Sequence, residues 1–324
     1  MATSACSRRP LAHSRQLAIA AAVAFVLGVG ALHSAAAQPL DAAMRSVVSV
    51  LPEWPPDLRR IEEPEGSGVV VLDGKTIVTA LHVVDKARAI HVRTRDGRIL
   101  KARLGGRDRA TDIATLSIDT ALPPIAMKPE TPGLGDRVCA IGNAFGLGLS
   151  VTCGVVSGLN RAGIGFNRVE DFVQTDAAVN PGASGGALVT DKGEFVGLLS
   201  AIFTKKSDAN IGVNFAVSAP LTQDVARQLR DRGRVKRPIS GMRLERVPAT
   251  GETGTLGARV VSMRPGSLAE RAGLAEGDII VRAGGRRVRK PADFVSAMSL
   301  LLRADELEIE IVRGGAAQKL RLVK

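Results

Sequence analysis

The feature that most restricts the fold is a dense series of short apolar segments between Val47 and Val217, with no long helical period among them. Turn-forming pairs such as Asp73-Gly74, Asp96-Gly97 and Pro132-Gly133 separate these segments. Short apolar runs bounded by turn residues are typical of β-sandwiches and β-barrels, so we expect a mainly β protein. The pattern predicts strands at 47–51, 69–72, 77–79, 90–94, 113–118, 138–141, 151–159, 195–199 and 213–217.

The first segment with a helical period is 221–232, where Leu221, Val225 and Leu229 fall on one face. It follows Pro220 and ends at Gly233 in a basic run. A helix end, a glycine and a charged run together predict a domain boundary, which divides the chain into residues 38–235 and 236–324. The second unit shows strand patterns at 258–262, 278–283, 307–312 and 319–323 and helix patterns at 267–272 and 291–302.

Residues 1–37 have the pattern of a secretory signal peptide. Arg8, Arg9 and Arg15 precede an apolar run at 17–32, which small residues follow. This order predicts cleavage after Ala37. The alternative is an uncleaved anchor, although the run is shorter than the roughly 20 residues that a spanning helix needs. Export predicts a periplasmic or secreted protein, or one held at the inner membrane if the anchor is retained.

The formal net charge is +12, and much of the basic excess lies in residues 227–237 and 282–290. Such runs can contact anionic lipid, cell-wall polymer or nucleic acid, or they can form a solvated basic face. Aromatic residues make up only 3% of the chain, and no nucleic-acid-binding motif accompanies the charge. Proteins that stack bases need exposed aromatic rings, so we expect no nucleic-acid partner.

Three cysteines are present, of which Cys6 would leave with the signal peptide. Cys139 and Cys153 flank an apolar hairpin whose turn is centred near Gly146, so they fall roughly opposite each other. In an oxidising compartment they can form a cross-strand disulfide, and two buried free thiols are the alternative. Neither lies in a CxxC pair or beside a histidine, so we expect no metal site. We also expect no organic cofactor.

Ser184 lies in the sharpest local motif, Asn180-Pro181-Gly182-Ala183-Ser184-Gly185-Gly186. A serine between glycines can occupy a tight turn, with its hydroxyl exposed and neighbouring N–H groups converging. Acyl transfer needs a nucleophile beside donors for the developing oxyanion. The motif alone also fits a plain glycine turn, so catalysis depends on suitable partners elsewhere.

A serine nucleophile needs a base, and His82 and His91 are the two histidines outside the signal peptide. His91 lies in an alternating strand pattern, where it would face solvent. His82 ends an apolar strand, and alone it would also fit a core histidine. Asp112 opens another apolar strand and can orient the imidazole, whereas Asp176 is closer in sequence to Ser184. The order His82, Asp112, Ser184 is that of the chymotrypsin-like double β-barrel.

These motifs resemble those of bacterial HtrA-type (Deg) serine proteases. Residues 79–84, Thr-Ala-Leu-His-Val-Val, are similar to T-N-x-H-V-V, and residues 111–114, Thr-Asp-Ile-Ala, to T-D-[LI]-A. Residues 141–148, Ile-Gly-Asn-Ala-Phe-Gly-Leu-Gly, resemble I-G-N-P-F-G-L-G, and residues 174–182 resemble the segment before the nucleophile of that family. The similarity extends from about Ser46 to the C-terminus.

The resemblance implies Ser184 as nucleophile, His82 as general base and acid, and Asp112 as the group that orients the imidazole. It implies an oxyanion hole formed by the backbone N–H groups of Gly182 and Ser184.

The resemblance also implies that Val213-Asn214-Phe215 form the strand that pairs with the substrate and edges the S1 pocket. Ala178 stands six residues before Ser184, where trypsin has the charged base of that pocket. A small aliphatic P1 residue is therefore expected.

Three positions depart from the family pattern. Ala183 and Ala80 stand where Asn is usual, and Ala187 stands where Pro is usual. Ala183 lacks a side chain that could hold the oxyanion turn. None of the three removes a triad atom, but a protease fold without activity is an alternative.

The C-terminal unit resembles a PDZ domain. Residues 265–274, Pro-Gly-Ser-Leu-Ala-Glu-Arg-Ala-Gly-Leu, and residues 276–280, Glu-Gly-Asp-Ile-Ile, match P-G-S-P-A-x-x-A-G-L and G-D-x-I. Such domains bind an extended peptide by strand addition and hold its C-terminal carboxylate in a backbone nest. The matching loop is Ile239-Ser240-Gly241-Met242, in which Ser240 occupies a normally apolar position.

Together these features indicate an endopeptidase that degrades unfolded or damaged envelope proteins, with a PDZ domain that binds substrate or activating C-terminal peptides. The resemblance implies a homotrimer. One alternative is a membrane-anchored regulatory protease with one specific target. The other is a proteolytically silent PDZ chaperone or adaptor.

Overall fold

The computed structural model describes Met1 and residues 39–56, 65–127, 131–202, 211–247 and 256–324. The predicted signal peptide, apart from Met1, lies outside the described residues. Within the described part of the chain, no helix is both long enough and apolar enough to span a membrane.

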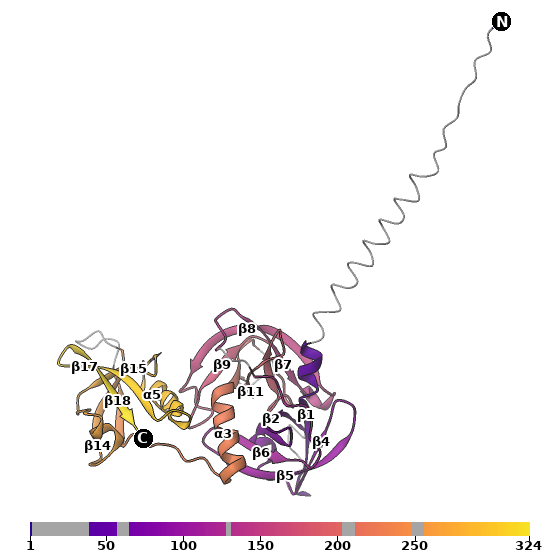
Figure 1. The fold of residues 1–324 in the computed structure, drawn as a ribbon, viewed down its shortest axis with the longest axis horizontal. Helices are drawn as coiled ribbons and strands as arrows, with labels where there is room; N and C mark the ends of the chain where they lie inside the picture. Colours follow the sequence, from indigo (N-terminus) through magenta and orange to yellow (C-terminus); the bar gives the residue numbers. More distant parts are fainter. Residues whose placement is uncertain (2–38, 57–64, 128–130, 203–210, 248–255) are drawn as a thin grey trace.

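Six antiparallel strands close a first barrel in the order β1-β2-β3-β6-β5-β4 (Figure 1). Its interior is filled by aliphatic side chains such as Val48, Val50, Ile77 and Leu116, all nearly inaccessible to solvent. Branched side chains pack well on a pleated surface, which favours strands here. The strands are β1 (Val47–Glu53), β2 (Gly66–Val71), β3 (Thr76–Ala80), β4 (Ala89–Arg93), β5 (Ile99–Asp108) and β6 (Ile113–Ser117).

A second closed barrel follows, in the order β10-β11-β12-β9-β8-β7. Its strands are β7 (Arg137–Gly142), β8 (Ser150–Arg161), β9 (Phe172–Thr175), β10 (Ala187–Thr190), β11 (Phe195–Ile202) and β12 (Asn214–Ser218). One core cluster includes Val69 and Val78 of the first barrel and Ile141 and Leu198 of the second. The two barrels therefore share buried apolar surface, and loops from both can meet at their junction.

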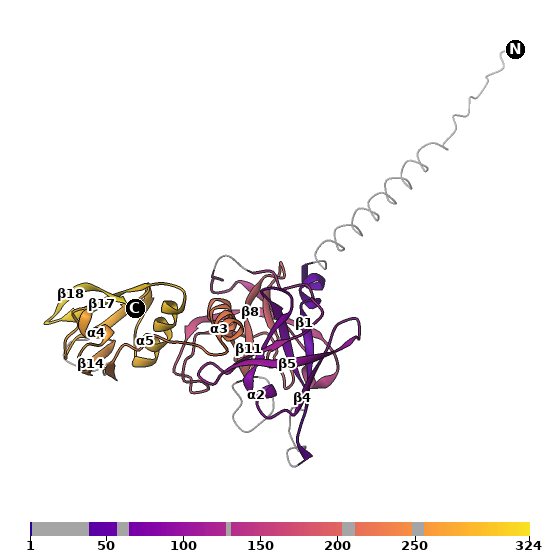
Figure 2. The same cartoon turned by 60° about the horizontal axis from the view of Figure 1, so that its bottom comes forward.

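Helix α3 (Ala219–Arg232) closes the N-terminal part of the chain. Ser218 caps its start by accepting a hydrogen bond from the Leu221 N–H, and Gly233 ends it with a φ of 67°. Leu221, Val225 and Leu229 are buried, as the helical period predicted. In both ribbon views α3 lies on the side of the barrels that faces the C-terminal unit (Figures 1 and 2).

The C-terminal unit is a sheet in the order β13-β14-β15-β17-β18, with β16 paired to β15. It has its own apolar core, which includes Val260, Ile280, Phe294 and Ile309. The strands are β13 (Met242–Arg246), β14 (Ala258–Met263), β15 (Ile279–Ala283), β16 (Arg286–Arg287), β17 (Glu306–Arg313) and β18 (Ala316–Val323). Three short helices, α4 (Leu268–Arg271), α5 (Pro291–Met298) and η3 (Ser299–Leu302), pack on it (Figure 2).

The mainly β class and the double barrel are confirmed, but four strands longer than two residues escaped the sequence patterns: β5, β9, β10 and β13. In β5 the exposed positions carry Lys101, Arg103 and Arg107, and Gly105-Gly106 interrupts its pairing with β6. This strand has no continuous apolar run. β9 and β10 have only four residues each.

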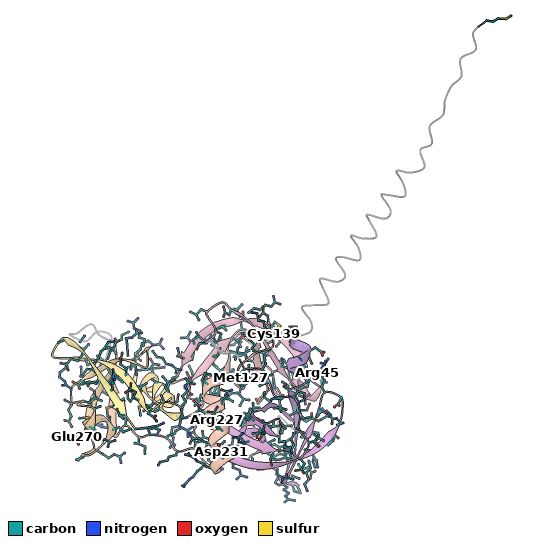
Figure 3. All side chains as sticks on the ribbon, in the orientation of Figure 1. Arg45, Met127, Cys139, Arg227, Asp231 and Glu270 are labelled. Carbon is teal, nitrogen blue, oxygen red and sulfur yellow. A yellow bond between two sulfur atoms is a disulfide. The ribbon has the colours of Figure 1, made fainter. Side chains whose placement is uncertain are left out.

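Cys139 and Cys153 face each other in the pairing of β7 with β8 and form a disulfide (Cys139 is labelled in Figure 3). Of the two alternatives, a cross-strand disulfide or two buried free thiols, the structure has the disulfide. It closes the hairpin whose connection contains the short helix η2 (Ala144–Gly146).

Ion pairs join the C-terminal unit and its linker to the barrels. Arg286 approaches the buried Asp171 at 2.8 Å, and Arg237 of the linker makes two hydrogen bonds to the buried Asp108. Lys290 at the start of α5 donates to the Gly163 carbonyl at 3.4 Å. The Arg286–Asp171 contact lies beside Ser218, at the start of α3.

Candidate active site

His82 and Asp112 are brought together by the register of β3 with β6, in which Ala80 pairs with Ile113. His82 lies two residues after Ala80, in the short helix α2 (Leu81–Val84), and Asp112 immediately precedes Ile113. The His82 Nδ1 and the Asp112 Oδ2 are 2.5 Å apart. A carboxylate that accepts a hydrogen bond from Nδ1–H keeps the proton on Nδ1 and leaves Nε2 able to take one, which is the tautomer of a general base.

The position of Asp112 is fixed by its backbone as well as by its side chain. Its carbonyl accepts from the Leu81 N–H at 2.8 Å, and its Oδ1 accepts from the His82 N–H at 3.0 Å. Its φ of 59° lies in the left-handed region, which is uncommon for a residue other than glycine. Such a conformation persists where the surroundings hold it, and here three hydrogen bonds to α2 do so.

Ser184 lies on a glycine turn between β9 and β10. Gly182 has a φ of 90° and Gly185 a φ of 84°. A Cβ at Gly185 would lie 2.5 Å from Thr79 Oγ1 and 2.9 Å from the Ala80 N. Only glycine therefore allows the turn to approach the end of β3, which leads directly to His82. The serine turn of the second barrel therefore lies against the end of β3 in the first, two residues before His82.

Ser67 in β2 holds the turn to the first barrel, and the sequence analysis missed it. Its N–H donates to the Ser184 carbonyl at 2.9 Å, and its hydroxyl donates to the Gly182 carbonyl at 2.8 Å. The same hydroxyl accepts from the Asn143 N–H at 2.8 Å. The signal that could have revealed it is a polar residue between two glycines, Gly66 and Gly68, in an otherwise apolar strand.

The geometry of the turn leaves two backbone donors available. Among the described residues, neither the Gly182 nor the Ser184 N–H donates a hydrogen bond. The Pro181 carbonyl accepts from the Phe145 N–H at 2.7 Å. Because a trans peptide points its C=O and N–H in opposite directions, this bond turns the Gly182 N–H away from the loop that carries Phe145.

Ala183, a departure from the family pattern, is 5% exposed, and its N–H donates to the Asn180 carbonyl at 3.0 Å. The turn closes through backbone bonds without a side chain from this position. Ala80 and Ala187 are fully buried in strands.

A cavity of about 440 Å³ opens beside His82 and Asp112. Ser200 of β11 lines it, and this residue was also missed because its sequence context is a plain apolar strand. The remaining lining residues are Leu81, Asp85, Arg109, Phe166 and Asn167.

The loop that carries Phe166 and Asn167 is organised by the buried Glu170. Its carboxylate accepts hydrogen bonds from the backbone N–H groups of Ile164, Gly165, Phe166 and Asn167, at 2.7–3.0 Å. The Asn167 side chain donates to the Thr111 carbonyl at 3.1 Å, next to Asp112. One wall of the site therefore depends on a single carboxylate.

The expected substrate strand needs a correction. Asn214 and Phe215 lie in β12, which pairs with β9 on one edge and with β11 on the other. Both edges are occupied, so these two residues cannot pair with a substrate backbone. The Asn214 side chain instead donates to the Ala177 carbonyl at 2.8 Å, and Val213 precedes the strand.

An open edge lies at the end of β11. Its pairing with β10 ends at Leu198, and Leu199 exchanges hydrogen bonds with Gly185 and Gly186 of the serine turn. Within the described residues, positions 201 and 202 pair on one side only, with β12, and Ser200 lies at the irregularity just before them. Ala178, expected at the base of the S1 pocket, is exposed, and its carbonyl accepts from Thr152 Oγ1 at 2.5 Å.

The loop Ile239-Ser240-Gly241-Met242 lies at the start of β13, an edge strand of the C-terminal sheet. Gly241 has a φ of 79°, and a Cβ there would lie 2.3 Å from the Ser267 Cβ. The Ser240 carbonyl accepts from the Ala269 N–H at 3.1 Å, and the Ser240 hydroxyl accepts from the Met242 N–H at 3.4 Å. Ile239 is 68% exposed.

Two family models match the chain. Residues 66–198 match the trypsin-like peptidase domain, and residues 259–313 match the PDZ domain. Together with the two closed barrels, these matches define a trypsin-like serine endopeptidase that carries a PDZ domain.

Individual relatives specify the family further. HhoB of Synechocystis sp. is 33% identical over 285 residues, which cover 82% of this chain and 67% of that protein. Periplasmic serine endoprotease DegP of Escherichia coli K12 is 37% identical over 259 residues, covering 77% of this chain and 54% of DegP. The solved structure of the HtrA-type protease AlgW with a tripeptide matches with a TM-score of 0.69 at 33% identity. The match covers 89% of this chain and 96% of the AlgW chain. The chain belongs to the HtrA family of serine proteases. It spans about half the length of the DegP relatives that it matches.

Proposed function

We propose that this chain is a serine endopeptidase that cleaves unfolded or damaged proteins of the cell envelope, with Ser184, His82 and Asp112 as its triad. The observation that carries the proposal is the His82–Asp112 pair at 2.5 Å, held beside a glycine turn that presents Ser184. Proteolysis through an acyl-enzyme needs a nucleophile, a base fixed in one tautomer and two oxyanion donors.

In the proposed mechanism, the Ser184 hydroxyl oxygen attacks the scissile carbonyl while His82 Nε2 takes its proton. The negative charge that develops on the carbonyl oxygen is stabilised by the Gly182 and Ser184 N–H groups. His82 then donates the proton to the leaving amine, and an acyl-enzyme forms. Water, deprotonated by His82, hydrolyses this ester, and Asp112 keeps the imidazole oriented throughout.

The backbone of residues 200–202 is our candidate for pairing with the substrate strand. It ends β11 next to the serine turn, and strand addition to an open edge is a common way to hold an extended peptide. Val213 and Phe215 remain candidates for the walls of the S1 pocket. Ala178 supports a preference for small aliphatic P1 residues, since this position carries no charge.

We propose that the chain acts in the periplasm, either free after cleavage at Ala37 or anchored to the inner membrane. The predicted signal peptide and the periplasmic names of the DegP relatives support this location. A homotrimer, as the family resemblance implies, is our proposed assembly.

The proposed domain boundary lies at 235/236, between the end of α3 and the PDZ loop. In the PDZ domain, the loop Ile239-Ser240-Gly241-Met242 and the edge of β13 would hold a C-terminal peptide. Solved structures of the HtrA-type protease AlgW with a tripeptide and with a decapeptide support the binding of short peptides by this chain.

The experiment is to incubate the mature chain with reduced casein and to identify the products by mass spectrometry. We expect cuts after small aliphatic residues, none with Ser184→Ala, and unchanged cuts with Ser157→Ala, which removes an exposed serine of β8. If wild type and Ser184→Ala both leave casein intact, also with C-terminal peptides present, the protease proposal is wrong and a PDZ chaperone or adaptor is the better account.

A further inference from the structure

A second cavity, of about 640 Å³, lies between α3, the linker after it and the PDZ domain. Arg227 and Asp231 of α3, labelled in Figure 3, line one side. Ile239, Leu268 and Leu301 line the other. A cavity of this size can hold several atoms of a ligand, and no step of the proposed peptidase mechanism uses it.

Positive side chains outnumber negative ones among the residues that line this cavity. Five cationic side chains face it and only one carboxylate, that of Asp231. The cations are Arg227, Arg232, Lys236, Arg237 and Lys324. Asp231 is paired at 2.8 Å with Arg230, which does not line the cavity.

Three of the five cations already have acidic partners. Arg237 is bonded to Asp108, Lys324 lies 3.2 Å from Asp305, and Arg227 lies 3.9 Å from Asp224.

Arg232 and Lys236 make no ion pair with any described residue, and both are exposed. Gln228 fixes the linker here, because its side chain accepts from the Lys236 N–H at 3.0 Å. The cavity is therefore lined by two exposed positive charges that form no ion pair with a described residue.

The opposite wall is apolar and adjoins the predicted carboxylate loop. Ile239 is the first residue of that loop, and Leu301 is fully buried in the PDZ core. A peptide added antiparallel to β13 would end beside Ser240-Gly241, because β13 begins at Met242. Its last residues would therefore reach the cavity that Ile239 lines.

We propose that this cavity binds the C-terminus of a partner polypeptide whose last two residues combine an apolar and an acidic side chain. The apolar side chain packs on the exposed Ile239, in the cavity that Leu268 and Leu301 also line, while Arg232 and Lys236 attract the acidic one. The inference rests on the proposed peptide binding by the PDZ domain and adds a contribution from the protease domain. Ligand selection is thus shared between the two domains.

The test measures peptide binding by fluorescence anisotropy in the full mature chain carrying Ser184→Ala, so that no peptide is cleaved. Three labelled decapeptides differ only in the residue before the last, so that they end in Asp-Val, Asn-Val or Lys-Val. We expect the Asp-Val peptide to bind about fivefold more tightly than the Asn-Val peptide, and the Lys-Val peptide to bind least, because each exposed ion pair contributes up to about fivefold. This preference should weaken as salt is added.

The decisive variant is Arg232→Gln with Lys236→Gln. It should bind the Asp-Val and Asn-Val peptides equally. The matched control, Arg234→Gln with Lys192→Gln, removes the same net charge from exposed positions that do not line the cavity, and it should keep the preference.

Each other result overturns the inference. If all three peptides bind equally, or if the decisive variant keeps the preference, the cavity does not select acidic ends, although PDZ binding stands. If no peptide binds, PDZ binding itself fails, whereas casein cleavage by the wild type tests the protease separately. If the decisive variant keeps the preference for the Asp-Val peptide but loses binding to phosphatidylglycerol vesicles, Arg232 and Lys236 bind an anionic membrane surface and the inference is wrong.

Discussion

Ser67 acts on the proposed oxyanion hole through two atoms of one residue. Its hydroxyl fixes the Gly182 carbonyl and its N–H fixes the Ser184 carbonyl. Replacing it with alanine removes the hydroxyl, so both the Gly182 carbonyl and the Asn143 N–H lose a buried partner.

We predict that Ser67→Ala lowers kcat for peptide cleavage by up to about 10²-fold with little change in KM, because the serine turn that carries the oxyanion donors loses a hydrogen bond, and complete loss of one donor typically lowers kcat by at least that factor. The matched control is Ser49→Ala, which removes a buried serine that pairs with Ser67 in the neighbouring strand β1. Equal loss of activity in the two variants would show that Ser67 has only a packing role.

Sequence motifs can predict candidate residues whose chemistry is local, but not residues whose role depends on contacts between barrels. His82, Asp112 and Ser184 stand in distinct motifs. Ser67 acts on Gly182, which is 115 positions away in sequence. Ser200 lies in a plain apolar strand. No local pattern records such contacts, because they arise only when two barrels pack together.

The β7–β8 hairpin links the disulfide to the serine turn. Cys139 and Cys153 join its strands, and its connecting loop supplies the Phe145 N–H that holds the Pro181 carbonyl. A cross-link stabilises a protein mainly by restricting the unfolded chain, and the two cysteines are separated by 14 positions.

We predict that Cys139→Ala with Cys153→Ala lowers the free energy of unfolding by about 3 kcal/mol, as measured by urea denaturation. Wild type treated with a reductant should unfold at the same lower urea concentration as the double variant. The double variant itself should not respond to reductant. A reductant effect that persists in the double variant would contradict this account.

Asp278 and Arg313 form an ion pair within the PDZ domain, with both carboxylate oxygens 2.7 Å from guanidinium nitrogens. Burial alone would raise the pKa of Asp278, but the hydrogen bonds from Arg313 and from the Ala275 N–H outweigh it and lower that pKa. A carboxylate with a lowered pKa in the folded state stabilises the protein above its unfolded pKa of about 3.9, and this stability is lost as the pH falls through the folded value.

We therefore predict that Asp278→Asn lowers the melting temperature of the full chain near neutral pH, and that the difference from wild type shrinks below about pH 4. Differential scanning calorimetry of both proteins, from neutral pH to below pH 4, measures this difference in melting temperature. The control Asp305→Asn changes an acid with a 93% exposed side chain and should have little effect. A melting-temperature difference between wild type and Asp278→Asn that grows as the pH falls would contradict a lowered pKa of Asp278.

The strands and helices also show which secondary-structure elements a sequence pattern can predict. Apolar runs predicted buried strands such as β1, β2 and β3, but not β9 and β10, which are buried and only four residues long. The helical period of α3 was recovered because one face packs on the barrels. β5 and β13 escaped because charged residues alternate along them. The pairing of β12 on both edges follows from barrel closure, which a single strand pattern does not contain.

In the whole molecule, Arg286 joins the PDZ domain to the barrels. It lies 2.8 Å from Asp171, whose side chain is 3% exposed and also accepts from the Ser218 hydroxyl at the start of α3. Removing one partner of a buried ion pair is costly because the other charge stays buried.

We predict that Arg286→Ala destabilises the interface by about 3 kcal/mol and loosens the domain arrangement. Small-angle X-ray scattering should show a larger radius of gyration, and limited proteolysis should cut the linker at 233–241 sooner. The control Arg287→Ala removes the neighbouring exposed arginine. An unchanged radius and cleavage rate in Arg286→Ala would show that this ion pair does not hold the domains.

The central claim, that Ser184 is a nucleophile activated by His82 and Asp112, is tested most directly by labelling with a fluorophosphonate and mapping the adduct by mass spectrometry. The account predicts a single adduct on Ser184, lost in His82→Ala and slowed by orders of magnitude in Asp112→Asn, but retained in Asp176→Asn. Asn tolerates the left-handed backbone of Asp112, so this variant should stay folded. An unlabelled Ser184 in the folded wild type, or equal labelling in His82→Ala, would contradict the account.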